Sequence, residues 1–151
     1  THASSLSQTN RIINSQMKIV AHVAATLLGL MFVFASVMVL FKLGPTPPMP
    51  PEGTPPAQFM AAFGPTGYLT FVKVFELLGG LLVVIPRTRN LGLLALGPII
   101  INILAFHIFV AGGHDLWSPM LMGICVLALF LLWYERRAFA CLVTRPLGKQ
   151  N

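Results

Sequence analysis

Four long apolar stretches alternate with polar segments along this chain, and they cover residues 17–43, 67–85, 91–111 and 116–134. Each is close to the roughly 20 residues that a helix needs to cross a bilayer. The links after the second and third stretches are only a few residues long, which favours antiparallel neighbours. The pattern predicts an all-α integral membrane protein folded as an up-down-up-down four-helix bundle.

The remaining segments divide the chain around a membrane domain at residues 17–135. Residues 1–16 are polar and rich in Ser, Thr and Asn, so we expect a mobile N-terminal segment. Residues 136–151 form a basic tail. A proline-rich outer loop covers residues 44–66, and its first half should form neither helix nor strand but polyproline II. The apolar second half, AQFMAAF, leaves two interpretations open: a stiff connector, or a lid over a pocket that opens outward.

Charge supports the membrane interpretation and orients it. Only 9% of the residues are charged, against about 25% in soluble domains. The basic residues flank the apolar stretches instead of forming a patch, so nucleic acid is not an expected partner. Positive residues favour the cytoplasmic side, which predicts a multi-pass protein of the plasma membrane with both termini cytoplasmic. The eight that fall on this side are Arg11, Lys18, Arg87, Arg89, Arg136, Arg137, Arg145 and Lys149.

Two opposite charges, Lys73 and Glu76, lie inside the second apolar stretch. A charge at membrane depth costs roughly 2.5–3.5 kcal/mol on insertion scales, so an intramembrane ion pair is a functional-site hypothesis by default. Because residues three and four apart share a helix face, Lys73, Glu76 and Gly80 form one stripe. We expect this stripe to face the interior of the bundle.

The third stretch adds Asn102 and His107. These two are about 140° apart on a regular helix, although Pro98 can bend the helix and change that relation. At about 1.5 Å per residue, Asn102 should lie nearly level with Lys73 and Glu76, and His107 should lie above them. The sequence therefore predicts a polar ligand-binding pocket made of Lys73, Glu76, Asn102 and His107.

A purely structural interpretation stays open for every one of these residues. The ion pair could lock helices together, Asn102 could bond to a neighbouring helix, and His107 could simply be packed. His22 belongs to a stripe with Thr26, Gly29 and Ser36 that is typical of helix packing, and it lies too near the cytoplasmic end to reach the pocket.

Other chemical motifs are absent from the sequence. It contains no HExxH, no Cys/His metal set, no CxxCH and no phosphate-binding glycine loop. The two cysteines, Cys125 and Cys141, are too far apart on a continuing helix to form a disulfide. We therefore expect no metal site and no covalently bound cofactor, and no catalytic residue is indicated.

Residues 67–110 carry a set of motifs with a family likeness. They are Lys73, Glu76, Gly79 and Gly80 in KVFELLGG, then Pro86, Leu91, Gly92, Pro98, Asn102, Phe106 and His107, preceded by F…AF…TGY over residues 59–68. In these residues the chain resembles the DoxX-like family of small four-helix membrane proteins of bacteria. The name-giving member resembles the small subunit of thiosulfate:quinone oxidoreductases, and other relatives accompany redox or detoxification systems. The resemblance implies a bacterial inner membrane protein and a non-covalently bound quinone.

Two functional hypotheses follow. In the first, the protein assists a membrane redox system, and its pocket binds a quinone head group or a small oxidisable solute. In the second, it is a non-catalytic accessory subunit that packs against a larger membrane complex. Expected partners are the lipid bilayer and either other membrane subunits or further copies of the chain. A small-solute permease is disfavoured because one four-helix protomer leaves little room for a path. The sequence does not decide whether the protein is an enzyme.

Overall fold

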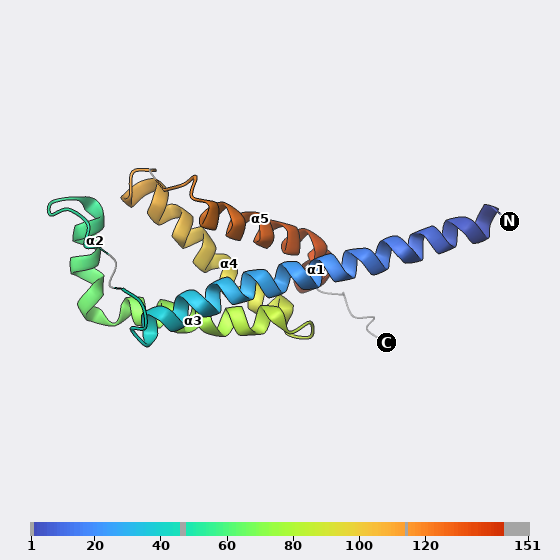
Figure 1. The fold of residues 1–151 in the computed structure, drawn as a ribbon, viewed down its shortest axis with the longest axis horizontal. Coiled ribbons are helices and arrows are strands. Elements are labelled where there is room, and N and C mark those ends of the chain that lie inside the picture. Colours follow the sequence, from blue (N-terminus) through green and yellow to red (C-terminus); the bar gives the residue numbers. More distant parts are fainter. Residues whose placement is uncertain (1, 46–47, 114, 144–151) are drawn as a thin grey trace, which may run out of the picture.

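The computed structural model describes residues 2–45, 48–113 and 115–143, and all regular structure in these ranges is helical (Figure 1). The all-α prediction is therefore confirmed for this part of the chain. The elements are α1 (His2–Leu40), α2 (Pro55–Phe63), the 3-10 helix η1 (Gly64–Thr66), α3 (Tyr68–Val84), α4 (Arg89–Ala105), the π-helix η2 (Phe106–Val110), α5 (Pro119–Tyr134) and α6 (Arg136–Val143).

The helices differ in their capacity to cross a membrane. In the described part of the chain, two are long and apolar enough by length and composition: Ser7–Leu40 in α1, and Arg89–Val110 in α4 with η2. A third candidate joins Pro55–Thr66 to α3, but the two parts are bent by 83°. The helix α5 is apolar but has only 16 residues. All four predicted stretches are thus helical, and two or three of them meet the length of a span.

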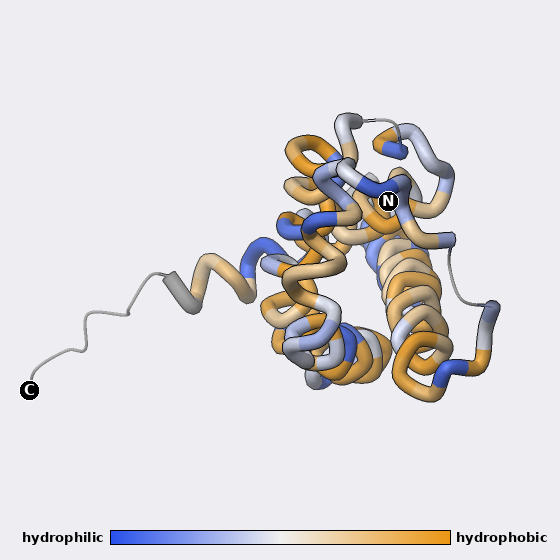
Figure 2. Tube along the Cα trace, turned by 90° about the vertical axis from the view of Figure 1, so that its left-hand side faces the viewer, coloured by the Kyte–Doolittle hydropathy of each residue, from blue (hydrophilic) through white to orange (hydrophobic). Residues whose placement is uncertain are grey.

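The four long helices pack side by side. In this part of the chain α1 packs against α3 and α5, α3 also packs against α4, and α4 makes a looser contact with α5. Successive long helices run in opposite directions, as the colours in Figure 1 show. The core between them includes the fully buried Leu28, Val83, Leu96 and Leu131. Figure 2 shows that these helices are apolar around most of their circumference, which is typical of helices surrounded by lipid.

Glycines allow the helices to approach closely. A Cβ atom at Gly29 of α1 would lie 2.6 Å from the Gly80 carbonyl oxygen of α3. A Cβ atom at Gly92 of α4 would lie 2.4 Å from the backbone nitrogen of Val83. Small residues permit such contacts between membrane helices. They hold α1 and α4 against α3, the helix that carries Lys73 and Glu76.

The N-terminal segment is helical. Residues 2–16, which belong to the segment expected to be polar and mobile, extend α1 as a helix that projects beyond its neighbours (Figure 1). The physical reason is that α1 contains no proline and no glycine before Gly29, so no residue breaks the helix.

The proline-rich loop and the tail also contain helices. Residues 41–45 and 48–54 form neither helix nor strand, which agrees with the prediction, and α2 starts at Pro55, a position that tolerates proline. The basic tail begins as α6. Arg145 and Lys149, which the orientation argument uses, lie outside the described residues.

Candidate ligand-binding cavity

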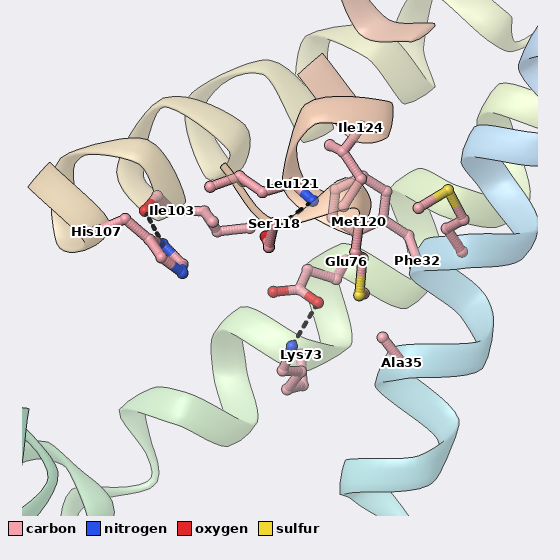
Figure 3. A pocket seen from close by; sticks show the side chains of 11 residues that line it. Phe32, Ala35, Lys73, Glu76, Ile103, His107, Ser118, Met120, Leu121 and Ile124 are labelled. Carbon is pink, nitrogen blue, oxygen red and sulfur yellow. Dashed lines mark hydrogen bonds and ion pairs between the residues drawn. The ribbon is translucent and has the colours of Figure 1, made fainter. Parts of the chain in front are cut away.

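A cavity of about 150 Å³ lies between the four long helices (Figure 3). Apolar side chains form most of its wall, and Lys73, Glu76, His107 and Ser118 are the polar members. The lining residues are Met31, Phe32, Ala35, Lys73, Glu76, Ile103, His107, Ser118, Met120, Leu121 and Ile124.

The Glu76 carboxylate is the most buried charge in the cavity wall, with 3% of the residue exposed. Lys73, one turn earlier on α3, donates a hydrogen bond from Nζ to Glu76 Oε2 over 2.7 Å. Ser36 of α1 donates a longer bond to the same oxygen over 3.4 Å. Glu76 Oε1 accepts no hydrogen bond from the described residues, and Figure 3 shows the second carboxylate oxygen directed into the cavity. Oε2 of Glu76 is therefore fixed by Lys73 and Ser36, and Oε1 remains free to accept a hydrogen bond from a ligand.

Lys73 is more exposed than Glu76, its partner in the ion pair. Its side chain is 26% exposed, whereas that of Glu76 is 4% exposed. A buried carboxylate without a partner would be strongly unfavourable, so the ammonium group balances the charge of Glu76. The pair adds no net charge to the apolar interior, yet it presents both a donor and an acceptor at the cavity wall.

His107 enters the cavity from the π-helical segment η2. Its Nδ1 lies 2.8 Å from the carbonyl oxygen of Ile103, and since a carbonyl only accepts, Nδ1–H is the donor. In the neutral ring Nε2 is then an acceptor. Figure 3 shows the ring directed toward the space that it shares with Glu76. Short π-helical segments often occur at functional sites because they re-aim a side chain without ending the helix.

Three of the four predicted site residues line this one cavity: Lys73, Glu76 and His107. Asn102 does not line it, and its side chain is exposed on α4. The angular separation of about 140° between Asn102 and His107 accounts for this, because Pro98 does not bring the two onto one face. Ser36 and Ser118 were not predicted as site residues. The stripe that contains Ser36 pointed to an inward face, but its spacing could not show that the hydroxyl meets Glu76.

A second polar cluster lies at the other end of the helices. Arg89, the first residue of α4, is 5% exposed and forms an ion pair with Glu135 over 3.2 Å. Its second terminal nitrogen donates to Nδ1 of His22 over 3.2 Å. Arg89 Nε is buried and has no hydrogen-bond partner among the described residues. As the sequence suggested, His22 lies apart from the cavity, and with Arg89 and Glu135 it connects the middle of α1 to the start of α4 and the end of α5.

Arg89 shows where the sequence reasoning was incomplete. It was treated only as a basic residue that marks the cytoplasmic side, and Glu135 was given no role. The structure buries the guanidinium group against the Glu135 carboxylate. The sequence did contain a sign of this ion pair: Arg89 and Glu135 both lie at the ends of apolar stretches, on the side of the membrane predicted to be cytoplasmic.

The described residues contain no group of three or more His, Cys, Asp or Glu side chains that could hold a metal ion. Cys125 and Cys141 are both free thiols. The candidate chemistry in this part of the chain is therefore that of Lys73, Glu76, His107 and the hydroxyl group of Ser118.

Comparison with known proteins adds little about function. No family model matches the chain, and no solved structure matches it. A segment of 73 residues is 42% identical to the uncharacterized protein YwoB of Bacillus subtilis (strain 168). The match covers 48% of this chain and 45% of that protein, so the chain spans less than half of the relative's length. These findings neither support nor contradict the DoxX-like resemblance.

Proposed function

We propose that this chain is a DoxX-like integral membrane protein that binds a quinone head group or a small oxidisable solute and assists a membrane redox system. The observation that carries the proposal is the convergence of Lys73, Glu76 and His107, from α3 and η2, on one otherwise apolar cavity. In an apolar interior, ionisable side chains are costly and are retained mainly at functional sites.

The membrane arrangement that we propose is a four-helix bundle of α1, α3, α4 with η2, and α5 in the bacterial inner membrane. Large apolar side chains on the outer surfaces support it, including Phe34, Ile101 and Leu129, each about two-thirds exposed. Exposed Trp117 and Trp133 near the two ends of α5 suit the two interfaces. The basic residues at the Arg89 end favour a cytoplasmic location for both termini.

The cavity suits a small ring that carries oxygen atoms. A cavity of about 150 Å³ is known to hold a benzene molecule. Lys73 can donate to a ligand oxygen, and His107 Nε2 can accept a hydrogen bond from a ligand hydroxyl. The side chains of Phe32, Ile103 and Leu121 supply apolar walls for the ring. A bound quinone would supply two-electron, two-proton redox chemistry.

The protein's own residues would position this ligand and move a proton. The Lys73 ammonium group holds a ligand oxygen while it stays paired with Glu76. Nε2 of His107 accepts a proton from the ligand hydroxyl, and the bond from Nδ1 to Ile103 keeps the ring in place. The free oxygen of Glu76 is a second acceptor on the same wall.

Binding of a short-chain quinol to the purified protein in lipid nanodiscs tests the proposal, with Lys73→Met and Glu76→Gln as the variants. Loss of one charge-assisted hydrogen bond is worth about 1.5–3 kcal/mol, so each variant should bind roughly tenfold or more weakly. Lys18→Met and Glu52→Gln make the same chemical changes at exposed positions and should bind as the unmodified protein does. Equal affinity of the cavity variants and these controls would contradict the proposal.

The accessory-subunit function is the second candidate, and one observation favours it. Lys73 and Glu76 already satisfy each other over 2.7 Å, and Ser36 ties the pair to α1, as a purely structural lock would. In that case Lys73→Met and Glu76→Gln should reduce accumulation of the protein, and the unmodified protein should bind no quinol. Stable variants that selectively lose quinol binding would favour the first candidate.

A further inference from the structure

One face of α4 and η2 is exposed along its entire length. Within the span from Arg89 to Val110, only 17% of an apolar window of 18 residues is buried inside the structure, against 33% of the corresponding window in α1. Four exposed apolar residues, Leu91, Leu94, Ile101 and Ile108, are three, seven and seven positions apart. These spacings are close to one and two helical turns, so the four side chains lie near one face and form an apolar stripe. Phe109 is exposed beside it.

Asn102 interrupts this apolar stripe. Its side chain is exposed, and it forms no hydrogen bond with any described residue. A carboxamide that faces hydrocarbon without a partner is unfavourable by several kcal/mol. Between membrane helices, asparagine commonly forms hydrogen bonds across the contact. The position of Asn102 therefore calls for a partner outside the single chain.

An apolar groove of about 310 Å³ lies beside Asn102. Pro98 and Ile99, the residues about one turn before Asn102, form part of its wall, and the rest comes from both α3 and α4. The lining residues are Phe71, Val72, Phe75, Leu94, Ala95, Pro98 and Ile99. The surface around the free amide is thus hollowed and apolar, a shape into which another helix can pack.

We propose that a second copy of this chain covers the α4 face, with the two Asn102 side chains hydrogen-bonded to each other across a two-fold axis. A carboxamide carries both a donor and an acceptor, so two identical groups satisfy each other. A two-fold interface places the same residue opposite itself when it lies near the axis. An acyl chain could fill the groove but offers the amide no hydrogen bond. This dimer rests on the membrane placement in the proposed function.

Cysteine cross-linking in reconstituted bilayers tests the dimer. In a background with Cys125→Ala and Cys141→Ser, a single cysteine replaces Ile101 on the proposed interface. In the control it replaces Leu129, which is similarly exposed but lies on α5. At a high lipid-to-protein ratio, we expect a covalent dimer from Ile101→Cys and little from Leu129→Cys. Equal cross-linking at the two positions, or none at either, overturns the dimer.

The amide itself is tested by adding Asn102→Leu to the Ile101→Cys chain. Loss of the paired hydrogen bonds should weaken association roughly tenfold, the change that about 1.4 kcal/mol produces. Asn102→Gln keeps the amide and should retain part of the cross-linking, whereas Thr70→Val removes an exposed hydroxyl from α3 and should change nothing. If the Asn102→Leu chain cross-links as much as its parent, the contact between the two Asn102 side chains is wrong. If, in native membranes, the cysteine at position 101 cross-links only to a different protein, the contact is wrong as well.

Resistance of the protein to alkaline extraction separates the two ways in which this experiment can fail. A chain that is extracted from the bilayer contradicts the membrane placement, and the dimer with it. A chain that stays in the bilayer but does not cross-link through position 101 contradicts the dimer alone.

Discussion

Replacement of Gly92 by alanine should destabilise the contact between α3 and α4. The added Cβ atom would lie 2.4 Å from the Val83 backbone nitrogen, 2.7 Å from the Val83 Cα atom and 2.9 Å from the Gly79 carbonyl oxygen. All three are backbone atoms, so no side chain can rotate away. Overpacking of this kind costs typically 1–3 kcal/mol. Relief requires α4 to move away from α3, the helix that carries Lys73 and Glu76.

Gly123→Ala is the matched control, because Gly123 lies inside the helix α5 and a Cβ atom there would meet no atom of another element within 4 Å. Both substitutions gain the helix propensity of alanine over glycine, about 1 kcal/mol. This gain cancels when the two variants are compared. The difference between them therefore measures the overpacking, about 1–3 kcal/mol in favour of Gly123→Ala.

The assay is thermal unfolding of the two variants in the same detergent. The fraction of protein that remains monodisperse is measured at each temperature, and the midpoint is taken from this curve. For a chain of this size, 1 kcal/mol corresponds to about 2–4 °C in the midpoint, so Gly92→Ala should unfold roughly 2–12 °C below Gly123→Ala. Equal midpoints, or a lower midpoint for Gly123→Ala, would refute the close approach of α3 and α4 at Gly92.

Three further substitutions test other contacts. Glu135→Leu leaves the buried Arg89 without its carboxylate and should lower the free energy of unfolding by about 3 kcal/mol. Adding Arg89→Met should recover much of this loss, and no recovery would argue against a buried ion pair. Ser36→Ala removes only a 3.4 Å bond to Glu76, so chemical denaturation should show a loss of about 1 kcal/mol or less; a loss as large as that of Glu135→Leu would contradict this. Phe59→Ala removes the ring contacts that tie α2 to η2 and should speed hydrogen exchange in α2 while exchange in α5 is unchanged; unchanged exchange in α2 would show that these rings do not hold it.

Much of the helical fold could be predicted because hydropathy reports local length and apolarity. The helices α3, α4 with its continuation η2, and α5 begin and end within a few residues of the predicted stretches. The course of residues 2–16 could not be predicted from their polarity, because helix continuation there depends on the absence of a break in α1 and not on burial. The helix α2 was also missed, since the prolines that precede it obscure its start at Pro55.

The candidate site was predictable in part for a geometric reason. Lys73 and Glu76 lie one turn apart, so their shared face follows from helix geometry alone. The inward direction of His107 and the outward direction of Asn102 depend on how α4 is rotated against α3 and α5, which one helix does not reveal. The meeting of Arg89, Glu135 and His22 depends likewise on the start of α4 and the end of α5 lying at the level of His22 on α1.

Photolabelling with an azidoquinone tests most directly whether the cavity of Lys73, Glu76 and His107 binds the proposed ligand. The label should attach to cavity-wall residues such as Ile103 and Met120, unlabelled quinone should suppress it, and Lys73→Met should reduce it strongly. Label found only on the outer surfaces of the helices, unaffected by competing quinone and by Lys73→Met, would contradict the central claim.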